Sequence, residues 1–185
     1  VDSSALTEQV VQDVLASAFD SAGQRCSALR VLCVQEDVAD RVLEMLRGAM
    51  AESLVGNPDR LNVDVGPVID REARDMIERH ITALQQKGRA VYRGSRIEAE
   101  CRYGTFISPA VIELESLDEI EHEVFGPVLH VIRYARKDLA MLLQQINNTG
   151  YGLTLGLHTR IDETIATVVG GAHAGNIYVN RNMVG

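Results

Sequence analysis

The chain has 185 residues, 46% hydrophobic and 24% charged, which is the balance of a soluble globular protein with one domain of ordinary size. A net charge of −8, with no cluster of lysine and arginine, argues against a nucleic-acid-binding surface. No apolar run is long enough to span a bilayer, and residues 1–4 lack the features of a signal peptide, so we expect a cytoplasmic protein without a membrane-spanning segment.

Hydrophobic spacing predicts helices and strands that alternate along the whole chain. Ser3 or Ser4 should cap the first helix, Asp37 the second, and Asp162 the last. In chain order the expected elements are a helix over residues 6–19, a strand over 29–35, a helix over 38–50, a helix over 69–87, strands over 90–93 and 105–113, a strand over 128–134, a helix over 137–147, a strand over 153–159, a helix from 162 to 169 and a strand over 176–180.

This order of elements predicts an α/β fold. Strands that alternate with helices, without internal repeats, favour three αβα layers with helices on both faces of a largely parallel sheet. The crossover connections should be right-handed.

The cysteines indicate reduced thiols. Cys26, Cys33 and Cys101 are odd in number and lack the paired spacing of a zinc site or a disulfide framework. The five histidines also show no metal-ligand spacing, so we expect no metal. Cys33 lies in an apolar run and should be a core residue.

Cys26 is the candidate nucleophile. It lies in a glycine-marked loop between the first helix and the first strand, with Arg25 beside it and Arg30 nearby. Positive neighbours lower the pKa of a thiol and so raise the fraction of reactive thiolate. From these residues alone, a small buried cysteine is the alternative.

Four segments carry a family resemblance. They read GQRCSA at residues 23–28, EVFGP at 123–127, NNTGYGL at 147–153 and AGNIYVN at 174–180. Together, and in this order, they resemble motifs of the aldehyde dehydrogenase superfamily. A single short motif would be weak evidence, but four in family order make a chance similarity unconvincing.

The resemblance implies oxidation of an aldehyde to a carboxylate with NAD as cofactor. Cys26 would be the catalytic nucleophile, and its backbone N–H would be one donor to the oxyanion. Glu123 would accept hydrogen bonds from the nicotinamide ribose, and Phe125 would pack beside the nicotinamide. Without this context, Glu123 would be read as a solvated turn carboxylate and Phe125 as a core aromatic residue.

The resemblance also implies a particular aldehyde substrate. Arg25, Ser27 and the final segment NIYVNRN at residues 176–182 resemble the L-glutamate γ-semialdehyde (1-pyrroline-5-carboxylate) dehydrogenase branch. They are most similar to its bacterial form, in which a separate proline dehydrogenase domain holds FAD. Ser27 would help to bind the α-carboxylate of the substrate, because a desolvated carboxylate needs hydrogen-bond donors.

The family pattern also implies that residues 1–185 are part of a catalytic domain. A deacylating glutamate, the dinucleotide-binding half and a glycine-rich substrate loop belong outside this sequence in that family. We therefore expect the isolated chain to be inactive and the intact parent to be a homo-oligomer.

Three alternatives stay open at this stage. The parent could oxidise a different aldehyde, or the chain could be a non-catalytic scaffold of the same fold. It could also be an unrelated thiol enzyme, which would need a histidine base close to Cys26.

Overall fold

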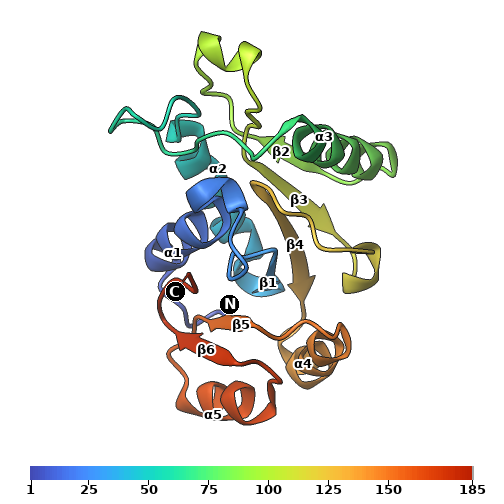
Figure 1. Ribbon diagram of the computed structural model, residues 1–185. Coiled ribbons are helices and arrows are strands. Elements are labelled where there is room, and N and C mark those ends of the chain that lie inside the picture. The colour runs from blue at the N-terminus through green and yellow to red at the C-terminus, as the bar shows by residue number, and fades with distance from the viewer. Residues whose placement is uncertain (185) are drawn as a thin grey trace.

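The structure is a computed structural model that describes residues 1–184 (Figure 1). Its main sheet has four strands in the order β1-β4-β3-β2. β4 is parallel to both of its neighbours, whereas β2 is antiparallel to β3. A separate parallel pair is formed by β5 and β6. The strands are β1 (Val31–Gln35), β2 (Val91–Arg93), β3 (Ala110–Leu114), β4 (Val128–Tyr134), β5 (Thr154–Leu157) and β6 (Asn176–Val179).

In the described residues, five α-helices flank these strands. α1 and α2 pack against each other and contact β4, α2 also contacts β1, and α3 packs beside β3. α4 and α5 lie with the β5–β6 pair in Figure 1 and are joined by a hydrogen bond of 2.8 Å from Asn147 Nδ2 to the Gly171 carbonyl. The helices are α1 (Thr7–Phe19), α2 (Glu36–Glu52), α3 (Arg71–Gln86), α4 (Leu139–Asn148) and α5 (Asp162–Gly171).

The hydrophobic core includes the residues at the interface of α1 and α2 with the main sheet. Buried residues of α2 recur every three or four positions, so one helical stripe faces the core. The first five residues of β4 are all buried, as expected for a central strand covered on both faces. The buried residues of α2 are Ala39, Val42, Leu43, Leu46 and Met50.

The predicted fold class is confirmed, and so are the existence and order of the elements. The first-helix caps are wrong: α1 has Leu6 at its N-cap position, and Ser4 Oγ instead contacts Asp2 and Thr159. Asp37 is also wrong as a cap, because α2 begins at Glu36 and the Asp37 carboxylate accepts a bond from Gln35.

Other boundaries differ for local reasons. The strand expected over 105–113 is limited to β3 (Ala110–Leu114), directly after Pro109, which has no N–H to give a sheet ladder. α3 begins after Asp70, whose side chain accepts a bond of 2.8 Å from Ala73 N, so Ile69 lies outside the helix and is exposed. Asp162 is the first residue of α5 rather than its cap. Among residues 1–184, no helix has both the length and the apolar character needed to cross a membrane.

Candidate functional site

The loop after α1 is folded tightly. Ser21, Ala22 and Gly23 have φ values of 55°, 53° and 65°, so three successive residues are left-handed. A β-carbon built on Gly23 would lie 2.1 Å from the carbonyl oxygen of Gly126. This approach is possible only without a side chain at position 23. It places the predicted nucleophile loop directly against the EVFGP segment, about a hundred residues later in the chain.

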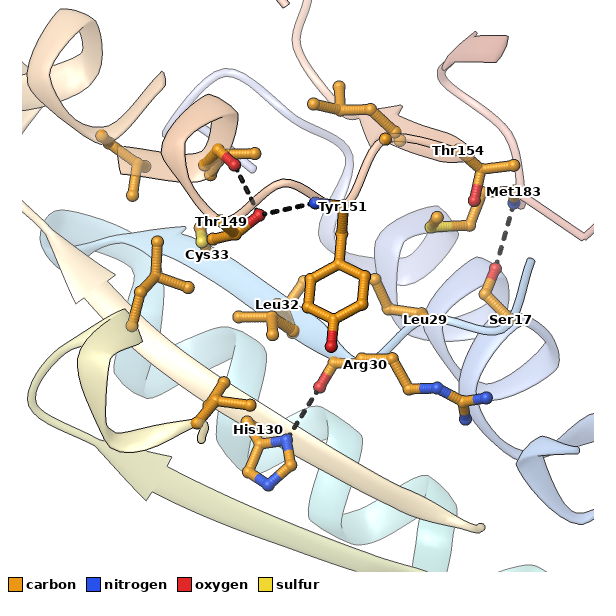
Figure 2. Close-up of a pocket in the computed structure, with 18 of the residues that line it drawn as sticks. Ser17, Leu29, Arg30, Leu32, Cys33, His130, Thr149, Tyr151, Thr154 and Met183 are labelled. Atoms are coloured by element: carbon orange, nitrogen blue, oxygen red, sulfur yellow. Dashed lines mark hydrogen bonds between the residues drawn. The ribbon is translucent and has the colours of Figure 1, made fainter. Parts of the chain in front are cut away.

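Cys26 is exposed on this loop and lines a cavity of about 1160 Å³. Glu123, Phe125 and Tyr151 line the same cavity, so the structure brings together residues from three of the four motif segments. Figure 2 shows the Tyr151 ring projecting into this space from the loop after α4. The core alternative for Cys26 is therefore wrong.

The other two thiols have different surroundings. Cys33 also lines the cavity, but burial raises its pKa to about 11. Cys101 is buried, burial raises its pKa, and its Sγ lies 3.6 Å from the Val55 carbonyl. At neutral pH both are overwhelmingly protonated, and a protonated thiol is a poor nucleophile.

We therefore expect Cys26 to be alkylated by iodoacetamide at least about tenfold faster than Cys33 or Cys101 in the folded protein. Timed alkylation with peptide mapping measures the three rates. In denaturant the rates should converge, because the difference comes from folding. Faster labelling of Cys33 or Cys101 in the native state would remove the chemical basis for assigning Cys26 as the nucleophile.

Glu123 and Phe125 lie on the irregular segment before β4. The Glu123 side chain is 29% exposed, and Phe125 is 41% exposed, so Phe125 is not the core aromatic residue of the alternative reading. Oε1 of Glu123 accepts a hydrogen bond of 3.1 Å from Arg30 Nε. Within residues 1–184, Oε2 accepts no hydrogen bond from the protein. Glu123 is thus a paired carboxylate and not a freely solvated one.

These two residues suit a nicotinamide nucleoside. An exposed aromatic ring can pack against a flat heteroaromatic ring, and an accessible carboxylate oxygen can accept bonds from ribose hydroxyls. Because Glu123 keeps one acceptor oxygen available and Phe125 is exposed, these two side chains fit the cofactor part that the resemblance implies.

The two arginines near Cys26 have hydrogen-bond partners other than the thiol. Arg25 Nε donates to Ser21 Oγ at 2.9 Å, and Arg30 pairs with Glu123. In the described part of the chain neither guanidinium hydrogen-bonds the Cys26 sulfur, so no direct contact supports the predicted activation. The Arg30–Glu123 pair was not predicted, because a separation of 93 residues leaves no local sequence signal.

Ser27 is half-buried beside Cys26. Among residues 1–184 its hydroxyl has no hydrogen-bond partner, but Ser27 is not one of the residues that line the cavity, so the structure does not bring it together with Glu123 and Phe125. Three of the five histidines have other side-chain partners: His80 Nε2 lies 2.8 Å from His130 Nε2, and His158 Nε2 lies 3.5 Å from Asp13. No described histidine hydrogen-bonds Cys26, which disfavours a thiol enzyme that uses a histidine base.

Comparison with known proteins places these observations in context. A family model described as "Aldehyde dehydrogenase family" matches residues 1–185. Bifunctional protein PutA of Klebsiella aerogenes is 68% identical over the whole chain, and 1-pyrroline-5-carboxylate dehydrogenase 2 of Bacillus subtilis is 36% identical. The chain spans 14% of the length of the first and 35% of the second.

A solved structure of a similar protein has a similar fold. The crystal structure of a bifunctional proline utilization A (PutA) protein superposes with a TM-score of 0.92 at 48% identity. The alignment covers 98% of this chain and 18% of that protein.

Proposed function

Because the chain belongs to the aldehyde dehydrogenase family, we propose that it is the nucleophile-bearing part of an NAD-dependent L-glutamate γ-semialdehyde dehydrogenase of proline catabolism. The observation that carries this proposal is the single cavity shared by exposed Cys26, Glu123 and Phe125. Chemistry at Cys26 and a cofactor at Glu123 require this proximity. The PutA and 1-pyrroline-5-carboxylate dehydrogenase relatives support the choice of substrate.

Cys26 starts the reaction as its thiolate. The sulfur adds to the aldehyde carbon, and the carbonyl electrons move to oxygen, which gives a thiohemiacetal. The Cys26 backbone N–H donates no hydrogen bond within the described residues, so it is available to the developing oxyanion. Loss of hydride converts the adduct into a thioester, and water then hydrolyses the thioester to the carboxylate and the free thiol.

NAD, when bound, supplies the acceptor for that hydride. Glu123 would hold the ribose through Oε2, and Phe125 would pack beside the nicotinamide. We assign the base that activates water to the longer protein, following the family pattern.

Ser27 is proposed to donate a hydrogen bond to the α-carboxylate of the substrate. We expect Ser27→Ala in the full-length protein to lower kcat/KM for glutamate semialdehyde by about 10- to 100-fold, the usual effect of losing a hydrogen bond to a charged group. With propanal, which has no carboxylate, kcat/KM should stay nearly unchanged. An equal loss on both aldehydes would show that Ser27 only shapes the loop.

The rest of the parent is also part of the proposal. The bifunctional relatives support a separate proline dehydrogenase domain, which would hold FAD, in the same longer protein. We further propose a cytoplasmic homo-oligomer. The isolated 185-residue chain should be inactive, because the cofactor also needs a dinucleotide-binding half.

Steady-state NADH formation tests the proposed activity. The full-length protein should oxidise glutamate semialdehyde with a higher kcat/KM than propanal, and the isolated chain should oxidise neither. Equal efficiency on both aldehydes would favour a general aldehyde dehydrogenase. Absence of turnover in a folded full-length protein would favour the non-catalytic scaffold.

A further inference from the structure

Arg30 joins the nucleophile loop to the cofactor segment. It lies four residues after Cys26 and just before β1, and only 14% of its side chain is exposed. Nη1 donates to the Gly23 carbonyl, and Nη2 donates to the Arg25 carbonyl at 3.0 Å. Both acceptors belong to the loop that carries Cys26. The same guanidinium therefore fixes the backbone on the N-terminal side of the nucleophile.

The same guanidinium also contacts the cofactor segment. Nε donates to Glu123 Oε1 at 3.1 Å, and the central carbon lies 4.5 Å from the centre of the Phe125 ring. A cation over an aromatic face and a charge-assisted hydrogen bond are both attractive, and burial strengthens both. One side chain thus contacts the two residues proposed to hold the cofactor and two carbonyls of the nucleophile loop.

The backbone of Arg30 is itself fixed. Its carbonyl accepts bonds from His130 N at 2.9 Å and from His130 Nδ1 at 3.1 Å, and Figure 2 shows the latter bond. A carbonyl only accepts, so Nδ1 carries the proton and Nε2 accepts from His80 Nε2–H at 2.8 Å. Burial lowers the pKa of His130 to about 4, so this neutral arrangement persists at neutral pH.

We propose that Arg30 is a positioning residue that acts through Glu123, orienting its carboxylate and the Phe125 ring relative to the Cys26 loop. This inference rests on the proposed cofactor role of Glu123. Arg30 holds Oε1, which leaves Oε2 able to accept hydrogen bonds from ribose hydroxyls, and it limits the rotamers of a side chain on an irregular segment. Lysine cannot replace it fully, because an ammonium lacks the planar fork that reaches several acceptors at once.

A double-mutant cycle in the full-length protein tests this role, with NAD⁺ binding measured by calorimetry. Arg30→Met should raise the Kd for NAD⁺ about tenfold or more, because Glu123 loses its charged partner. In a Glu123→Ala background the same change should raise Kd by no more than about twofold. The Kd of Arg30→Lys for NAD⁺ should lie between those of Arg30→Met and the unmodified protein. If Arg30→Met does not fold, Arg30→Lys replaces it in the cycle.

The matched control is Arg93→Met, which removes the ion pair between Arg93 and Glu78 at the surface. It should leave the Kd for NAD⁺ unchanged. A tenfold rise in Kd with Arg30→Met in both backgrounds would mean that Arg30 only stabilises the Cys26 loop and does not act through Glu123. No change in Kd in either background would contradict any role of Arg30 in cofactor binding. If Glu123→Ala itself leaves NAD⁺ binding intact, the proposed cofactor site is wrong, which is a different failure.

Discussion

Cys26→Ala in the full-length protein should lower kcat for glutamate semialdehyde by at least about 10⁴-fold, because the covalent route disappears with its nucleophile. The Cys26 side chain is exposed, so truncation should leave no cavity and should change the thermal midpoint little. The loss would thus report chemistry rather than unfolding. NADH formation gives the rate, and circular dichroism on heating gives the midpoint.

Cys101→Ala is the matched control for this prediction. Cys101 is buried and away from the cavity residues, so its loss should lower stability but leave turnover per folded molecule unchanged. If Cys26→Ala retained turnover, or if Cys101→Ala abolished it in folded protein, the assignment of the nucleophile would be wrong.

Gly23→Ala should be the most damaging backbone substitution in the site. Its φ of +65° disfavours any side chain, and the added β-carbon would lie 2.1 Å from the Gly126 carbonyl oxygen. Left-handed strain and overpacking together predict a loss of about 2–4 kcal/mol in the free energy of unfolding. The atom that the new β-carbon would meet is a backbone oxygen, so no side-chain rotation can relieve the clash. Activity should fall as well, since the Cys26 loop must move away from the EVFGP segment.

Gly88→Ala distinguishes the cost of left-handed backbone strain from the cost of the steric clash. Gly88 also has a positive φ, +84°, but a β-carbon there meets no atom within 4 Å. Only the backbone term applies, so urea unfolding should show a loss of about 1–2 kcal/mol with activity preserved. Equal losses for the two variants would contradict the close packing between the Cys26 loop and Gly126.

Much of the fold could be predicted from the sequence because its signals are local. The apolar run of β4 (Val128–Tyr134) was predicted with the observed bounds, since a central strand needs apolar residues on both faces. Caps were harder to predict. Ser4 has the right side chain for a cap, but its partners Asp2 and Thr159 include one 155 residues away, which no local pattern reveals.

In the candidate site, too, residues with a local sequence signal could be predicted, whereas contacts between distant residues could not. Cys26, Glu123 and Phe125 could be identified because short motifs mark them, and the structure places all three on one cavity. The role of Arg30 could not be predicted, because it depends on a contact across 93 residues. Arg30 was predicted only as a positive neighbour of the thiol, and its ion pair with Glu123 became visible only in the fold.

Trapping the covalent intermediate tests whether Cys26 is the nucleophile. The full-length protein would be mixed with glutamate semialdehyde and NAD⁺, quenched in acid within a turnover, digested and analysed by mass spectrometry. We expect a glutamyl thioester on the peptide that contains Cys26, and none when NAD⁺ is omitted. An acyl group on Cys33 or Cys101, or NADH formation with no acylated cysteine at any quench time, would contradict this assignment.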